Sequence, residues 1–174
     1  LLTKVGVYAI IRSQTLLFPP EAQQGSFLLV LAGFTMVIGV LGALAQDDLR
    51  RMLSFHIVSH IGYMIFGLAL FTLAGIAAAV FYVVHHIVVK TALFLVAGLV
   101  ERRAGSDRLS RIGGLVRSAP MIAVLFALPA LSIAGLPPFS GFVGKFALVG
   151  SGIESDEWAI VAVSLIVSLL TMYV

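Results

Sequence analysis

Long apolar runs separated by short polar connections dominate the hydropathy pattern of this chain. A helix that crosses the roughly 30 Å core of a bilayer needs about 20 mostly apolar residues. Lipid offers no water to unpaired backbone groups, and unbroken apolar runs without period-two alternation favour helices over a barrel. The pattern therefore predicts an all-α integral membrane protein, a bundle of about six transmembrane helices. The expected spans are residues 1–18, 26–45, 52–71, 75–99, 119–149 and 158–174.

One of these runs is too long for a single straight crossing. Residues 119–149 carry Gly135, Pro137, Pro138 and Gly141 near their middle, and two adjacent prolines interrupt the hydrogen bonds of a helix. Non-helical backbone at membrane depth is tolerated only where it is buried in protein or lines a cavity, and discontinuous helices recur at transporter sites. We therefore expect one broken crossing. The alternative is two short helices joined by an ordinary loop outside the membrane.

Loop charges predict an orientation. If residues 119–149 cross the membrane once, the arginine-rich loops 46–51 and 101–118 lie on the same side. The positive-inside rule then places both loops in the cytoplasm. If the run crossed twice, the acidic residues after it would join the arginine side. With one crossing, the opposite side carries Glu21, Glu154, Asp156 and Glu157.

Composition supports a membrane protein. Of 174 residues, 60% are hydrophobic and 11% are charged, whereas about 25% are charged in a typical soluble domain. The chain has no cysteine, which excludes disulfides, thiolate metal sites and cysteine nucleophiles. Its net charge of +3 comes from loop residues rather than a basic stripe, so we expect no nucleic-acid partner. Because the chain starts at Leu1 and stops at Val174 inside an apolar run, we expect one transmembrane domain, residues 1–174, truncated at both ends.

Ionisable residues inside the apolar spans are the strongest functional signal. All three lysines and all four histidines lie within the predicted spans, whereas the arginines lie in loops or near span ends. A charge at mid-bilayer costs from about 2.5 to well over 10 kcal/mol, so such residues persist mainly in ion or proton pathways. Histidine, and lysine when buried, can exchange protons near neutral pH, whereas arginine cannot. The candidates are Lys4, His56, His60, His85, His86, Lys90 and Lys145.

Spacing narrows this set. His56 and His60 are four residues apart, as are His86 and Lys90, so each pair shares one face of a helix and can line a polar path. A lone membrane histidine can instead hydrogen-bond a neighbouring helix, and a lysine near a helix end can extend to the headgroups. His56 and His85, taken singly, fit that simpler interpretation equally well and are secondary candidates. Lys145 follows the proline break closely, where freed carbonyls and water can stabilise its charge.

Five stretches of the sequence resemble a known family in both order and spacing. They are residues 3–12, 47–53, 59–64, 86–94, and 135–138 together with 141–145. In these stretches the chain resembles the D-type subunits of the multisubunit Mrp-type cation/proton antiporters, which are similar to the antiporter-like subunits of respiratory complex I.

The resemblance implies roles for five residues. Lys4 and Lys90 would belong to a chain of buried lysines that runs along the membrane plane. His60 and His86 would lie on the same polar axis. Lys145 would be its terminal basic residue, on the broken helix. The family's glutamate and its paired lysine have no counterpart, because no acidic residue lies inside a span, so this chain would hold only the second half of the pathway.

The resemblance further implies a transporter subunit rather than an enzyme, without catalytic residues, bound cofactor or metal. It would move protons in exchange for a monovalent cation such as Na+, beside other membrane subunits in the bacterial cytoplasmic membrane. One alternative is a proton-pumping subunit of complex I or of a membrane-bound hydrogenase. A second is a bis-histidine haem protein that uses His60 and His86. A purely structural scaffold would leave the buried lysines unexplained.

Overall fold

The computed structural model describes residues 2–18 and 25–174, and these ranges are helical apart from turns, one short 3-10 segment and an isolated bridge. The predicted all-α class is therefore confirmed. Glu21, one of the loop charges, lies outside the described residues. The helices are α1 (Leu2–Leu16), α2 (Gly25–Leu44), α3 (Leu49–Ala69), α4 (Leu73–Ala104), α5 (Leu115–Ser118), α6 (Pro120–Ala134), α7 (Ser140–Glu154) and α8 (Trp158–Tyr173).

Three of the described helices are long and apolar enough to cross a membrane, namely α2, α3 and α4, while α6 and α8 are shorter apolar helices. The predicted span 75–99 is part of a 32-residue helix that continues to Ala104. Six crossings therefore stay a prediction.

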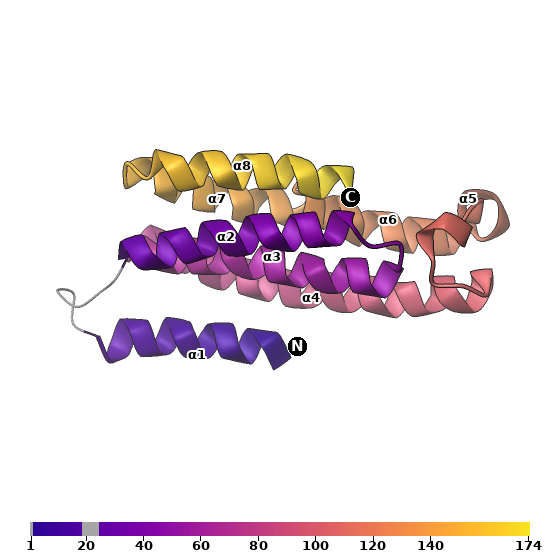
Figure 1. The fold of residues 1–174 in the computed structure, drawn as a ribbon, viewed down its shortest axis with the longest axis horizontal. Coiled ribbons are helices and arrows are strands. Elements are labelled where there is room, and N and C mark those ends of the chain that lie inside the picture. The colour runs from indigo at the N-terminus through magenta and orange to yellow at the C-terminus, as the bar shows by residue number, and fades with distance from the viewer. Residues whose placement is uncertain (1, 19–24) are drawn as a thin grey trace.

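The long helices lie lengthwise beside one another (Figure 1). Loops 45–48 and 105–119 lie at one end of this bundle, and turns 70–72 and 155–157 lie at the other (Figure 1). Helix α3 occupies the centre, since it packs against α2 on one side and α4 on the other. Helix α1 contacts the bundle through α3.

Helices α2 and α3 approach closely because glycines lie where they touch. A Cβ atom at Gly39 would overlap the backbone of Ser59, and one at Gly62 would overlap Met36. The Ser59 hydroxyl donates a hydrogen bond to the Met36 carbonyl across this contact, at 2.9 Å. Small residues and interhelical hydrogen bonds are typical of helix packing within membranes.

The run 119–149 is interrupted as the sequence predicts. Helix α6 ends at Ala134, Gly135 adopts a left-handed conformation with φ of 87°, and α7 begins at Ser140. Both halves pack against α4, and Figure 1 shows them end to end along the bundle. Helix α4 is long enough to contact both halves, because its 32 residues reach about 48 Å at 1.5 Å per residue.

Exposure is inverted relative to a water-soluble protein. The outer surface carries many large apolar side chains, such as Val30, Phe34, Leu95 and Ile166, each more than half exposed. The interior holds ionisable side chains among its apolar ones. Those that are buried are Lys4, His56, His60, His85, His86, Lys90 and Lys145.

Backbone and side-chain contacts tie together the two loops at the arginine-rich end. The Leu49 amide donates to the Asp107 carbonyl at 3.0 Å, and the Leu109 amide donates to the Asp47 carbonyl at 2.7 Å. The Asp47 carboxylate accepts hydrogen bonds from the Ser110 hydroxyl at 2.8 Å and the Ser110 amide at 3.0 Å. These contacts fix the end of α2 to the segment that follows α4, and we call this connection between the two loops the junction.

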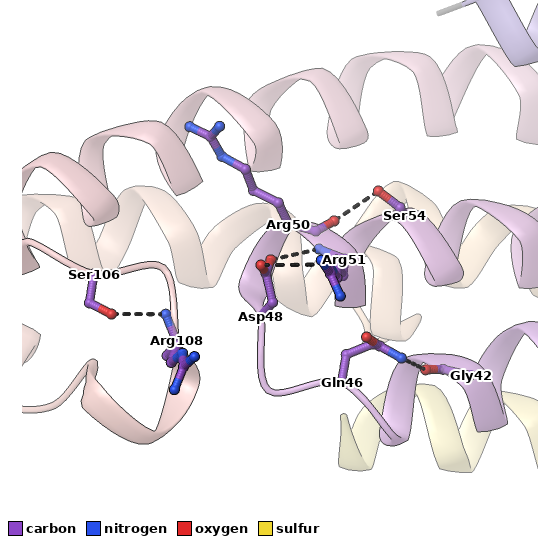
Figure 2. Close-up of polar contacts among 8 residues, drawn as sticks. All are labelled: Gly42, Gln46, Asp48, Arg50, Arg51, Ser54, Ser106 and Arg108. Carbon is purple, nitrogen blue, oxygen red and sulfur yellow. Dashed lines mark hydrogen bonds and ion pairs between the residues drawn. The ribbon is translucent and has the colours of Figure 1, made fainter.

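Local caps order the helix ends at this junction, as Figure 2 shows. Asp48 caps α3, because its carboxylate accepts a hydrogen bond from the Arg51 amide at 3.0 Å. The Gln46 amide group donates to the Gly42 carbonyl at the end of α2, and Asp48 pairs with Arg108 through an isolated antiparallel bridge. Such caps satisfy backbone groups that helix ends leave without partners.

The junction should loosen in acid. The hydrogen bonds from Ser110 lower the pKa of the Asp47 carboxyl below its usual 3.8, and Arg108 and Arg111 add to this. A carboxyl whose pKa is depressed by folding stabilises the structure above its unfolded pKa and loses that effect as pH falls. We expect the Ser110 amide to exchange faster, relative to its intrinsic rate, once the pH drops below about 4.

Hydrogen exchange measured by mass spectrometry on the assembled complex checks this expectation. Asp47→Asn is the matched control, because the amide keeps the shape of the side chain without its titration. An identical pH dependence in both proteins would contradict the role of the carboxylate.

Candidate functional site

Five of the predicted site residues lie in the interior, on four different helices. Lys4 is on α1, His60 on α3, His86 and Lys90 on α4, and Lys145 on α7. Each side chain is at most 7% exposed. Lysine side chains normally extend their ammonium groups to water. The nearly complete burial of three lysines is therefore unusual.

Lys4, His86 and Lys90 line one cavity of about 310 Å³. The Lys90 ammonium donates a hydrogen bond to the Leu53 carbonyl of α3 at 3.2 Å. The Lys4 ammonium and both ring nitrogens of His86 have no partner among the described residues. Unsatisfied polar groups around a cavity of this size are the conditions under which buried water is held.

The histidines of α3 and α4 lie side by side. The ring centroids of His56 and His60 are 6.0 Å apart, and those of His60 and His86 are 4.9 Å apart. The helical spacing predicts the first of these contacts, whereas the second depends on how α3 packs against α4. His56 thus joins the cluster and is more than an isolated membrane histidine.

His85 lies away from this row. Its Nδ1 is 2.9 Å from the Ser140 hydroxyl, at the start of α7. This contact agrees with the simpler interpretation of a membrane histidine, in which the ring hydrogen-bonds a neighbouring helix. Its ring is next to Tyr82, with 5.6 Å between centroids.

Two tyrosines complete the cluster and were missed at the sequence level. The Tyr82 hydroxyl lies 2.7 Å from Nδ1 of His60, and the Tyr63 hydroxyl donates to the Ser164 carbonyl. A signal for both exists in the spacing, because Tyr63 is three residues after His60 and Tyr82 is four before His86. Residues at these spacings share a helix face.

Lys145 lies at the break between α6 and α7. Its ammonium donates to the carbonyl of Ala134, the last residue of α6, at 3.0 Å and contacts the Ser168 hydroxyl of α8 at 2.9 Å. It also lies 5.5 Å from the centroid of the Tyr63 ring. The interruption after Ala134 leaves that carbonyl available, since the last carbonyls of a helix lack intrahelical partners.

The buried lysines have no acidic partner within the described residues. The two ion pairs there join Arg50 to Glu101 and Arg51 to Asp48, at the arginine-rich end. A buried charge without a counter-ion is costly, so these lysines need water, carbonyl groups or a neutral state.

The cluster does not fit the haem alternative. The His60 and His86 rings, at 4.9 Å between centroids, contact each other directly and leave no room for a macrocycle between them. Across residues 2–18 and 25–174, no group of three histidine or acidic side chains is arranged to hold a metal ion.

Known proteins are similar to this chain in both sequence and fold. A family model described as "NADH:quinone oxidoreductase/Mrp antiporter, TM" matches residues 1–171. The D-type subunit of the Na(+)/H(+) antiporter of Alkalihalophilus pseudofirmus is 48% identical over 174 residues, which are 99% of this chain and 35% of that protein.

Two solved structures agree. A chain in the structure of the Mrp complex from Dietzia sp. matches with a TM-score of 0.94 and 43% identity, over 98% of this chain and 32% of that chain. A chain of respiratory complex I from Thermus thermophilus matches with a TM-score of 0.88 and 31% identity, over 98% and 36%. The chain thus spans about a third of the length of these relatives. Since the family model covers nearly all of it, the chain belongs to the NADH:quinone oxidoreductase/Mrp antiporter transmembrane family.

Proposed function

We propose that this chain forms the second half of the proton pathway in a proton-translocating subunit of a monovalent cation/proton antiporter. The observation that carries the proposal is the buried row of ionisable side chains from Lys4 to Lys145, set on four helices and bordered by cavities. The 48% identity to a protein named as a Na(+)/H(+) antiporter subunit supports Na+ as the exchanged cation.

The geometry suggests an order of sites along the row. Lys4, His86 and Lys90 share one cavity, His60 follows through its contact with His86, and Lys145 lies beyond the tyrosines. Histidine titrates near neutral pH by itself, and burial disfavours the charged form of lysine, which brings lysine toward the same range. A proton can therefore pass from group to group through intervening water, with no acidic residue of the described ranges taking part.

We further propose six crossings, with α6 and α7 forming a single broken one. Their end-to-end arrangement along α4 supports this topology (Figure 1). The arginine-rich loops 46–51 and 101–118 then lie in the cytoplasm, and the chain is one transmembrane domain in a bacterial cytoplasmic membrane. Other membrane subunits would be its partners, because the structures it resembles are multisubunit assemblies.

Cysteine labelling tests this topology without interference from native cysteines of this chain, which has none. Ala104→Cys and Glu154→Cys place single thiols at exposed positions near opposite ends of the bundle. We expect a membrane-impermeant maleimide to label Ala104→Cys only in inside-out vesicles and Glu154→Cys only in right-side-out ones. Labelling of both thiols from one side would show that residues 119–149 cross twice.

Exchange by the purified complete complex tests the function. In proteoliposomes with an imposed Na+ gradient, a pH-sensitive dye should report proton movement without any electron donor. Complexes carrying Lys90→Ala provide the matched control for leakage. Respiratory complex I remains the second candidate, since one of its chains matches with a TM-score of 0.88. Proton movement that requires an electron donor, or co-purifying flavin and iron–sulfur proteins, would favour it and reject the antiporter.

A further inference from the structure

Two separate cavities flank the centre of the buried row. The first is the cavity of about 310 Å³ that Lys4, His86 and Lys90 line. The second, of about 170 Å³, is lined by residues that include Tyr63 and Lys145. Both exceed the roughly 30 Å³ that one water molecule occupies in the liquid. No described residue lines both of them.

Four aromatic rings lie between these cavities, and we call them the aromatic plug: His60, Tyr63, Tyr82 and His86. None is more than 1% exposed. Neighbouring rings are in contact, with 4.9 Å between the centroids of His60 and His86 and 5.7 Å between those of Tyr63 and Tyr82. The plug therefore separates the two cavities, and a proton that moves from one to the other has to cross it through side chains.

One hydrogen bond connects members of the plug within the described structure. It joins Nδ1 of His60 to the hydroxyl of Tyr82 at 2.7 Å. The remaining hydroxyl, on Tyr63, donates to the backbone carbonyl of Ser164 instead. Nε2 of His60 has no described partner, so it is available to receive a proton.

We propose that protons cross the aromatic plug through the His60–Tyr82 hydrogen bond, with the Tyr82 hydroxyl as the proton acceptor. This inference rests on the proposed function. It adds a tyrosine to a proton path for which the sequence predicts lysines and histidines alone.

One proton crosses without a net change of charge on either side chain. With hydrogen on Nδ1, His60 donates to the Tyr82 oxygen, and an incoming proton binds Nε2. The N–H bond at Nδ1 then breaks while a new O–H bond forms on Tyr82, and the original hydroxyl hydrogen of Tyr82 leaves to a water molecule. His60 ends neutral with hydrogen on Nε2, and Tyr82 keeps one hydrogen.

Matched tyrosine variants of the complete complex test this step. Tyr82→Phe removes the acceptor oxygen and preserves the ring, and we expect Na+/H+ exchange per assembled complex to fall by about a hundredfold or more, as for loss of a positioned acid–base group. Tyr8→Phe makes the same chemical change in a tyrosine of α1 that lies outside the plug and is 59% exposed. It should exchange close to the wild-type rate.

A solvent isotope effect separates proton transfer from packing. In Tyr82→Phe the remaining exchange should slow more in D2O than the wild type does, because the proton step now limits the rate. Undiminished exchange, an equal loss in both variants, or failure of Tyr82→Phe alone to assemble would each overturn the inference. Undiminished exchange in Tyr82→Phe together with loss in Lys90→Ala would reject only the role of Tyr82, whereas undiminished exchange in both would reject the proposed function.

Discussion

Lys90→Ala should reduce cation/proton exchange by the complete complex by at least about a hundredfold, the lower end of what positioned proton-transfer groups contribute. Lys90 is the ionisable group through which α4 contacts the α3 backbone, at the Leu53 carbonyl, and it lines the same cavity as Lys4 and His86. Without it, the row loses the proton acceptor that contacts the α3 backbone. Dye-reported exchange in vesicles measures the effect.

Two companion variants make the result specific. Lys90→Arg keeps the positive charge but cannot release a proton, so it should be nearly as inactive as Lys90→Ala. Thr91→Ala alters a neighbouring residue of the same cavity. Within the described part of the chain, the Thr91 hydroxyl bonds only to its own helix, at the Ile87 carbonyl, so this variant should remain active. If Lys90→Arg supported normal exchange, charge alone would suffice and transfer through Lys90 would be refuted.

Gly141→Ala should destabilise the assembled complex strongly. A Cβ atom at this position would overlap the backbone carbonyl of Ser132 and approach the ring of His85. A backbone carbonyl cannot rotate away as a flexible side chain can, so the end of α6 and the start of α7 would have to separate. Overpacking typically costs about 1–3 kcal/mol, and we expect the upper part of that range.

Thermal unfolding of the complex in detergent checks the Gly141 prediction. Gly150→Ala is the matched control on the same helix, because nothing lies within 4 Å of its added Cβ and alanine is the better helix former. It should leave stability unchanged or slightly raised. Equal unfolding temperatures for Gly141→Ala and the wild type would show that α6 and α7 do not need the close approach.

The helical class and the break in residues 119–149 could be predicted from the sequence, because lipid permits few structures and adjacent prolines interrupt a helix. The ends of α4 could not be predicted from hydropathy alone. This helix continues through Arg102 and Arg103 to Ala104, since a helix need not stop where the hydrocarbon does. The better signal is Gly105, which adopts a left-handed conformation with φ of 70° after the last turn.

The charged members of the candidate site could be chosen from the sequence, but the contacts between them could not. Lysines and histidines stand out in an apolar span because burying them is costly. Tyr63 and Tyr82 do not stand out, since an aromatic ring with one hydroxyl is an ordinary core residue. His85 and His86 are adjacent in sequence, yet one contacts Ser140 of α7 and the other adjoins His60 of α3. Only the packing of neighbouring helices separates their roles.

Chemical rescue at position 90 tests the central claim most directly, that a proton passes through an amine buried in this chain. Lys90→Cys should abolish exchange, and alkylation with bromoethylamine, which rebuilds a lysine-like amine on the sulfur, should restore it. Iodoacetamide, which adds a neutral group, should not. Restoration by the amine reagent alone is the predicted result; an active Lys90→Cys complex, or equal recovery with both reagents, would contradict the account.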